Sequence, residues 1–126
     1  MILVDSDILI QYSRGDLVAA NWLETVSQSH EIAISVVTEI ELLFGSRDKG
    51  HLKETRQLLA TFIIVQIDET VSKRTSSLIE KYCLSHRLEM PDALIAATAL
   101  VNNFELGTIN KKDFRFIEGL RLIDYP

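Results

Sequence analysis

The chain opens with the stretch Met1-Ile2-Leu3-Val4-Asp5-Ser6-Asp7-Ile8-Leu9-Ile10, in which two aspartates interrupt an apolar run. A short apolar run bounded by polar residues is typical of a strand buried on both faces of a sheet. Acids at the carboxyl end of such a strand lie where open α/β sheets place their ligand crevice. Because a buried charge must be paired or coordinate a metal, we predict that Asp5 belongs to a metal-carboxylate site. The rest of the chain should then supply further acids.

The size and composition predict one globular domain over residues 1–126. A chain of 126 residues, 47% of them hydrophobic and 25% charged, is large enough to bury a core and is not typical of disorder. The single cysteine, Cys83, cannot form an internal disulfide, so we expect a reducing, cytoplasmic environment. No apolar run approaches the roughly 20 residues that cross a bilayer. Asp5 and Asp7 also interrupt the start, which is unlike a signal peptide.

The net charge restricts how the protein could handle nucleic acid. Eighteen Asp and Glu residues against thirteen Lys and Arg leave a formal charge of −5. This charge weighs against a broad basic face that grips nucleic acid. It does not exclude nucleic-acid chemistry, because carboxylates gathered around divalent cations add to the acidic count, and bound ions reverse the sign of the local field.

Segments with strand and helix character alternate along the chain. The strand-like segments are residues 1–4, 31–34, 62–67, 104–108 and 120–123. Helical periodicity is found at residues 8–12, 17–27, 36–46, 52–61, 92–102 and in a longer helix that opens at 68–69. This alternation predicts an α/β fold, with a central, mainly parallel sheet and helices on both faces.

The helix at 36–46 carries two acids whose positions leave a choice open. Its expected core-facing stripe consists of Val36, Val37, Ile40, Leu43 and Phe44. At 100° per residue, Glu39 and Glu41 lie about 100° to either side of Ile40. Periodicity therefore cannot decide which glutamate is a site residue, and a glutamate at the edge of a stripe is usually solvated.

The other candidate acids also have a structural alternative. Asp5 is either the N-cap of the following helix or a metal ligand. Asp7 is either a first-turn acid stabilised by the helix dipole or a direct ligand. Asp92 follows Pro91 and begins a helix that is apolar nearly all round, so it is a first-turn acid or a ligand at the interior end of the sheet. Asp113 lies in a loop-like stretch and is a weak candidate by itself.

Together these pieces resemble the PIN-domain ribonucleases, and most closely the VapC-type toxins of prokaryotic toxin–antitoxin pairs. The resemblance covers essentially the whole chain. Residues 2–9 look like the opening motif of the family, in which hydrophobic residues precede Asp-Thr-Asn-Val-Leu. The invariant aspartate of that motif corresponds to Asp5, while Ser6 replaces the usual threonine and Asp7 the usual asparagine.

Three further motifs follow in the family's order. Residues 34–45 end in Glu-Leu, two residues and a glycine, and this register selects Glu41 while Glu39 remains an additional charge nearby. Residues 91–97 resemble the third motif and select Asp92. Residues 108–114 resemble the fourth motif, Thr-x-Asn-x-x-Asp-Phe, in which Asp113 or Asn110 would complete the site. Residues 119–122 look like the usual closing strand.

The resemblance implies a PIN-like three-layer fold and a magnesium-dependent endoribonuclease toxin that hydrolyses RNA phosphodiester bonds. The implied catalytic and metal-binding residues are Asp5, Glu41, Asp92 and Asp113, with Mn²⁺ able to substitute for Mg²⁺. The supporting polar residues are Ser6, Asp7, Thr108 and Asn110. Candidate contacts to the RNA backbone are Arg14, Arg47, Lys49, Lys111, Lys112 and Arg115. A homodimer and a cognate VapB-type antitoxin that covers the site are the implied protein partners; no histidine is required, and all three are expected at the surface.

Two other enzyme or signalling classes share parts of this pattern. A receiver domain would use Asp68 after the third strand, but it also needs a lysine after a late strand, where Thr108 is followed by Ile109 and Asn110. A haloacid-dehalogenase-type phosphatase would use Asp5 and Asp7, but the later lysine and paired acids are missing and the chain is short. A PIN domain that only binds is disfavoured because all four acids are available.

Overall fold

A computed structural model describes all 126 residues and alternates four strands with six α-helices. The elements are β1 (Ile2–Val4), α1 (Ser6–Ser13), α2 (Leu17–Ser27), β2 (Ile32–Ser35), α3 (Val36–Phe44), α4 (Lys49–Leu59), β3 (Ile63–Val65), α5 (Glu69–His86), α6 (Met90–Asn102), β4 (Glu105–Gly107) and the 3₁₀ turn η1 (Lys111–Asp113). The predicted helices and the first four strands are present, with ends that differ by a few residues. None of the helices combines the length and the apolar character needed to span a membrane.

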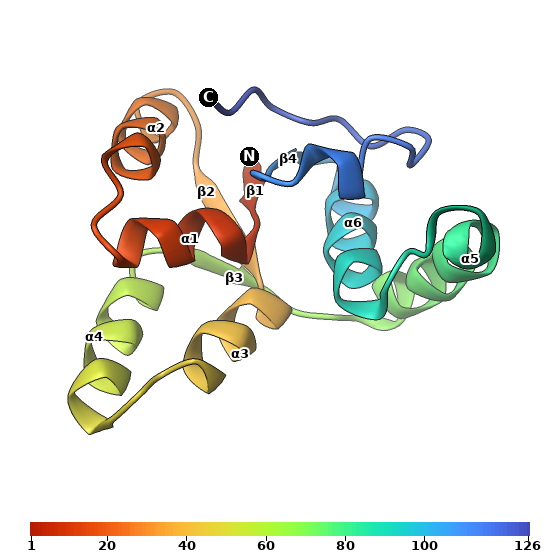
Figure 1. Cartoon of the computed structure of the whole chain (residues 1–126). Helices are drawn as coiled ribbons and strands as arrows, with labels where there is room; N and C mark the ends of the chain where they lie inside the picture. The colour runs from red at the N-terminus through yellow and green to blue at the C-terminus, as the bar shows by residue number, and fades with distance from the viewer.

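The four strands form one parallel sheet in the order β3-β2-β1-β4, with β1 between β2 and β4. Leu3 points to a core that α5 and α6 cover, whereas Ile2 and Val4 point to a core built with α1 and α2. Figure 1 shows these two groups of helices on opposite sides of the sheet. The predicted α/β class, with a parallel sheet between helical layers, is confirmed.

The predicted strand at 120–123 is wrong. Only a single bridge, between Leu106 and Leu122, joins this segment to β4. The chain then leaves the sheet edge. The carbonyl of Asp124 accepts a hydrogen bond of 2.7 Å from the indole Nε1 of Trp22, which lies in α2. The terminal segment therefore packs over α2 instead of extending the sheet.

The predicted buried face of α3 is confirmed only in part, because Val36, Val37 and Leu43 are half-buried while its other two residues are exposed. Ile40 is 57% exposed and Phe44 is 91% exposed, although both lie in the apolar stripe. The fully buried positions of α3 are Thr38 and Leu42. The side chain of Ser35 caps the helix by accepting a hydrogen bond from the N–H of Val37. The helix packs at the end of the sheet, and only the narrow side that carries Thr38 and Leu42 is buried. Periodicity detects an apolar stripe but does not determine which neighbour covers it.

The pairing of β1 with β4 determines which residues meet at the carboxyl end of the sheet. Val4 lies opposite Gly107 in the parallel register, so the next residues, Asp5 and Thr108, emerge side by side. Gly107 is required here because a Cβ at this position would lie 2.5 Å from the Trp22 ring. This close packing brings the loop after β4 against the start of α1.

Candidate active site

Asp5 ends β1 and caps α1. Its carboxylate accepts a hydrogen bond from the N–H of Ser6 at 2.7 Å, and the side chain is almost completely buried, with 6% exposure of the residue. The cap alternative is therefore confirmed. Capping uses mainly one carboxylate oxygen, so it is compatible with a second role for Asp5 in the group of acids described below.

Thr108 and Asp7 hold the loop after β4 against α1. The buried hydroxyl of Thr108 donates to Oδ2 of Asp5 at 2.9 Å and also lies 3.1 Å from Oδ2 of Asp7. The same oxygen of Asp7 accepts the backbone N–H groups of Ile109 and Asn110 at 3.0 and 3.2 Å. Asp7 thus anchors the loop by accepting hydrogen bonds from three donors. Asn110 contributes its backbone N–H and not its side chain.

Asp92 and Asp113 line the same pocket, although they belong to different elements of the C-terminal half. Asp92 lies in the first turn of α6, and Asp113 ends η1. Burial, together with nearby negative charges, raises the pKa of Asp92 from 3.8 to about 6. These charges are, in decreasing order of effect, those of Asp113, Glu89, Glu41 and Asp7. The carboxylate of Asp113 therefore acts directly on Asp92.

The structure separates the two glutamates of α3. Glu39 forms an ion pair with Arg56 of α4, with 3.5 Å between Oε2 and the guanidinium nitrogen. Glu41 instead turns toward α1, where the hydroxyl of Ser6 lies 3.5 Å from its Oε1. Burial raises the pKa of Glu41, and the charge of Asp7 raises it further. Glu41 is thus the glutamate of α3 that faces the other acids.

These acids lie together without a compensating cation. Burial, followed by the charges of Asp7 and Asp92, raises the pKa of Asp5 from 3.8 to about 7, despite the opposing hydrogen bonds from Thr108 and Ser6. The ion pairs of the protein, which are Arg56–Glu39, Lys73–Glu69, Lys81–Glu118 and Lys111–Asp124, include none of the predicted catalytic acids. The acids do not form a ready ligand shell, because no three Asp, Glu, His or Cys side chains are close enough to hold an ion as they stand.

Two pockets adjoin the acids, one on each side. A pocket of about 420 Å³ contains Glu41 together with Arg14 and Arg47. A pocket of about 250 Å³ contains Asp92 and Asp113. Both have basic residues on their rims, as the sequence predicted for Arg14, Arg47 and Lys112. Neither pocket is lined by Lys49 or Arg115, and Lys111 donates to the carbonyl of Tyr125 at 3.3 Å instead.

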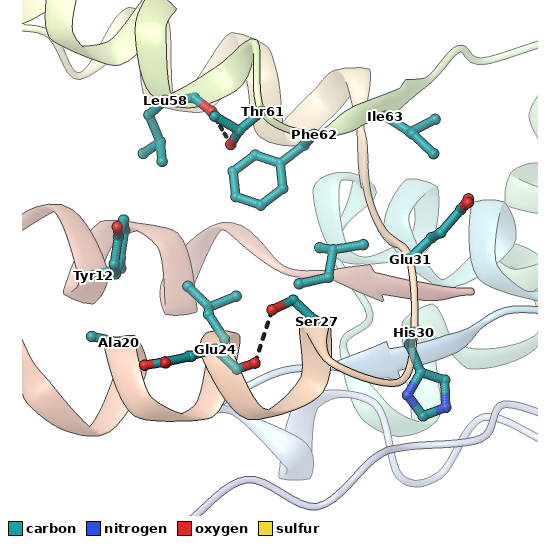
Figure 2. Close-up of a pocket in the computed structure, with 12 residues that line it drawn as sticks. Tyr12, Ala20, Glu24, Ser27, His30, Glu31, Leu58, Thr61, Phe62 and Ile63 are labelled. Atoms are coloured by element: carbon teal, nitrogen blue, oxygen red, sulfur yellow. Dashed lines mark hydrogen bonds between the residues drawn. The ribbon is translucent and has the colours of Figure 1, made fainter.

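A third pocket, larger than these two, lies elsewhere. It measures about 660 Å³, and its lining includes Tyr12 of α1, Ala20 of α2, Leu58 of α4 and Ile63 of β3 (Figure 2). None of the predicted catalytic acids lines it. Pocket size therefore does not point to the acids, whereas their burial and mutual repulsion make them the candidate site.

Sequence reasoning missed the aromatic side of the 250 Å³ pocket. His86 and Phe116 both line it, and their rings are stacked with centroids 4.2 Å apart. His86 was correctly expected at the surface, but nothing in its sequence neighbourhood indicates that it lies beside Asp92. Asp68, the key residue of a receiver domain, lies at the other end of α5 and caps it by accepting the N–H of Val71 at 2.8 Å.

Comparison with known proteins gives a consistent result. The PIN domain family model matches residues 2–118. The chain is 39% identical to Ribonuclease VapC10 of Mycobacterium tuberculosis, over 96% of this chain and 91% of the relative. A toxin–antitoxin complex from Klebsiella pneumoniae superposes with a TM-score of 0.81 at 35% identity, covering 95% of each chain. VapBC2 from Rickettsia felis, bound to a DNA fragment from the VapBC2 promoter, matches with a TM-score of 0.85 over the full length of both chains, and its 23% identity supports the shared fold.

Proposed function

The chain belongs to the PIN-domain family as a VapC-type ribonuclease toxin of a toxin–antitoxin system, and on this premise we propose that it is a magnesium-dependent endoribonuclease that hydrolyses RNA phosphodiester bonds. Residues 1–126 act as a single PIN domain in this proposal. The residues that hold the metal and perform catalysis are Asp5, Glu41, Asp92 and Asp113.

The observation that carries the proposal is the burial of Asp5, and the partial burial of Asp92, beside further acids and without an ion-paired cation. Buried carboxylates of this kind are paired or coordinate metals in folded proteins. All the donors are carboxylate oxygens, which suit Mg²⁺ or Mn²⁺ and not a metal that prefers sulfur or imidazole. Mg²⁺ also retains several waters, so a site of few direct ligands fits it.

The residues have separable roles in hydrolysis. When bound, a divalent ion supplies positive charge at the scissile phosphodiester and lowers the pKa of the attacking water. Asp5 and Asp92 hold the ion, and Thr108 keeps Asp5 oriented through its 2.9 Å hydrogen bond. Glu41 contacts Ser6 through Oε1, which leaves Oε2 to accept the proton of the attacking water. The raised pKa of Glu41 makes this carboxylate a better base than an ordinary surface glutamate.

The same site suggests how a protein partner would inhibit it. We propose that a cognate VapB-type antitoxin covers the acids and inserts a basic side chain among them, because no cation of this chain occupies that place. We also propose that the toxin is a homodimer. The exposed side chains of Ile40 and Phe44 on α3 support such an assembly, since apolar side chains this exposed are typical of an interface.

The deciding experiment compares matched aspartate variants. Asp5→Ala and Asp92→Asn should abolish magnesium-dependent cleavage of total RNA, while circular dichroism shows that both remain folded. Asp68→Asn is the control, since asparagine caps a helix as well as aspartate does, and this variant should cleave as the wild type does. Full activity of purified Asp5→Ala or Asp92→Asn would contradict the proposal.

A further inference from the structure

The pocket of about 250 Å³ beside Asp92 combines features that the four acids do not explain. It is lined by the proposed catalytic acids Asp92 and Asp113, by a third acid, Glu89, by Leu88, by two cations and by two aromatic rings. The two cations are Arg87 and Lys112, and the rings are those of His86 and Phe116. We propose that this pocket binds one nucleotide of single-stranded RNA next to the scissile bond, with its base stacked on His86 and its phosphate held by Arg87 and Lys112.

Three aromatic rings pack together as a platform, and His86, which also meets Tyr82 edge-on at 5.8 Å, is the exposed one. His86 lies parallel to Phe116, with 12° between the ring planes, and Tyr82 contacts Phe116 edge-on at 5.1 Å. Phe116 is thus enclosed by its two neighbours, whereas His86 is exposed at the end of α5. An exposed ring backed by a second ring is a surface on which a nucleobase stacks, since every base has a flat face.

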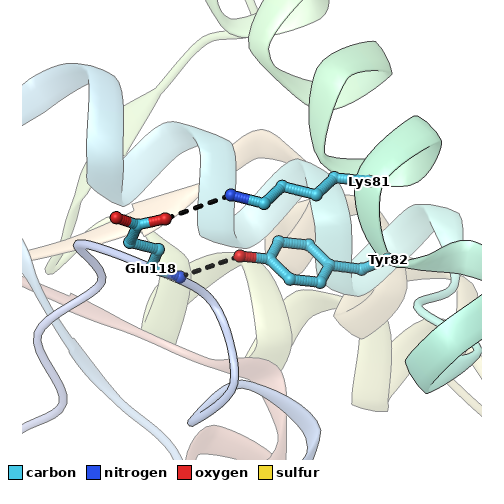
Figure 3. Close-up of polar contacts among 3 residues, drawn as sticks. All are labelled: Lys81, Tyr82 and Glu118. Carbon is cyan, nitrogen blue, oxygen red and sulfur yellow. Dashed lines mark hydrogen bonds and ion pairs between the residues drawn. The ribbon is translucent and has the colours of Figure 1, made fainter.

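The platform is held in place by contacts that do not involve the ligand. Figure 3 shows Glu118 tied to α5 in two ways. Its backbone N–H donates to the hydroxyl of Tyr82 at 3.1 Å, and its carboxylate accepts the ammonium of Lys81 at 3.1 Å. The segment from Asp113 to Glu118 is therefore fixed against α5, and the platform and the catalytic acid on that segment keep their spacing.

The two cations are available to a ligand. Arg87 and Lys112 are both exposed, and neither makes a side-chain hydrogen bond or an ion pair within the protein. The cations are more exposed than Asp92 and Asp113 in the same pocket, which suits a ligand that presents a negative group to the cations and a neutral ring to the aromatic side chains. A nucleotide has this polarity, and phosphate contacts of this kind position the strand.

An unpaired nucleotide fits this pocket better than a base pair. The bases of an RNA duplex are stacked on one another and present only their edges, so a ring platform requires a base that is free of its neighbours. This inference rests on the proposed ribonuclease activity. It adds that the nucleotide bound next to Asp92 must be unpaired. It also explains how a protein with a net charge of −5 retains RNA beside its acids.

The test measures KM and kcat for cleavage of an oligoribonucleotide whose cleavage position has been mapped. It combines substitutions of His86 with removal of single bases from the substrate. His86→Ala should raise KM about tenfold, the loss expected for one stacked base, with kcat within about twofold. His86→Phe should restore KM, because phenylalanine keeps the stack. A series of substrates with one abasic nucleotide near the cleavage site should contain one member on which the wild type and His86→Ala have the same KM.

Two further variants separate stacking from general effects. Lys112→Ala should raise KM and reduce the slope of log affinity against log salt by about 1. His30→Ala is the matched control, because His30 is also exposed and interacts with the preceding serine, at 2.9 Å compared with 2.7 Å for His86 and Ser85. Its KM should equal that of the wild type.

The outcomes distinguish this subsite from the proposed function. If the wild type cleaves RNA and Asp92→Asn does not, but His86→Ala has an unchanged KM, the subsite is overturned and the ribonuclease stands. A KM increase in His86→Ala that persists equally on every abasic substrate also overturns it, since the ring would then act without a base. Absence of magnesium-dependent cleavage by the wild type overturns both.

Discussion

The hydroxyl of Thr108 donates a hydrogen bond to Oδ2 of Asp5 at 2.9 Å, across 103 residues of sequence. Both side chains are buried, and the contact follows from the register that sets Val4 opposite Gly107. The same hydroxyl lies 3.1 Å from Asp7, so its one hydrogen serves two carboxylates. Thr108 therefore links the strand that carries the first acid to the loop that leads to Asp113.

Thr108→Val should weaken metal binding without changing the shape of the core. Valine removes the donor that lowers the pKa of Asp5, so the carboxyl holds its proton more tightly and competes less well for a cation. We expect half-maximal RNA cleavage to require about tenfold more Mg²⁺, as for other residues that orient a metal ligand. A magnesium titration of initial rates measures this change. Thr108→Ser keeps the hydroxyl and should need Mg²⁺ within about threefold of the wild type; equal behaviour of the two variants would refute the role.

The metal-free protein should lose stability as the pH rises from about 4 to about 7. The folded state holds the proton of Asp5 up to a pKa of about 7, while the unfolded chain releases it near 3.8. The folded state therefore binds more protons in this window, and the free energy of unfolding falls with pH by up to about 1.4 kcal/mol per unit. Urea denaturation in EDTA at several pH values measures the slope.

Asp5→Asn is the control for this pH dependence. Asparagine cannot ionise, so the contribution of Asp5 to the slope should disappear, that of Asp92, whose pKa is raised to about 6, should remain, and the variant should be more stable than the wild type at pH 7.5. Adding Mg²⁺ at pH 7.5 should restore stability to the wild type, because an ion that binds only the folded state shifts the equilibrium toward it. A wild-type profile as flat as that of Asp5→Asn would show that burial of Asp5 is not coupled to folding.

The two glutamates of α3 should differ sharply in function. Glu41→Gln should lower kcat for RNA cleavage by about 100-fold, within the range for loss of a general base, because its carboxylate faces the other acids. Glu39→Gln should leave kcat unchanged and lower the free energy of unfolding by less than about 1 kcal/mol, because only its partly exposed ion pair with Arg56 is lost. Steady-state cleavage and thermal melting of both proteins give the comparison, and the reverse order of activities would exclude Glu41 from the site.

Gly107→Ala should destabilise the fold. The added methyl would lie 2.5 Å from the ring of Trp22, and that ring cannot easily withdraw because its Nε1 binds the carbonyl of Asp124. Overpacking of this kind costs about 1–3 kcal/mol, measurable by urea denaturation. Gly50→Ala is the matched control, since Gly50 lies in the first turn of α4 and an added Cβ would meet only Oδ1 of Asp48, at 3.4 Å. It should change the free energy of unfolding by less than about 1 kcal/mol, and equal effects of the two substitutions would contradict the packing account.

Local sequence signals predicted the elements well because they act within a few residues. The apolar run before Asp5 forms β1, residues 17–27 form α2, and Pro91 lies in the first turn of α6, each as expected. Signals failed where a neighbour far along the chain decides the outcome. Ile40 and Phe44 of the apolar stripe of α3 are exposed, and the segment at 120–123 forms one bridge instead of a strand, because each depends on what packs against it.

The sequence by itself determined the α/β class, the family and the candidate acids, since periodicity, capping and motif spacing are properties of neighbouring residues. The motif register selected Glu41, which helical periodicity alone could not do, and the structure agrees with it. Only the tertiary structure decided that Asp7 anchors the loop after β4 and that His86 lies beside Asp92. These relationships depend on the placement of β1 between β2 and β4 and on the packing of α5 against α6. Strand order and helix packing bring distant residues together, and that proximity is not encoded in any single segment.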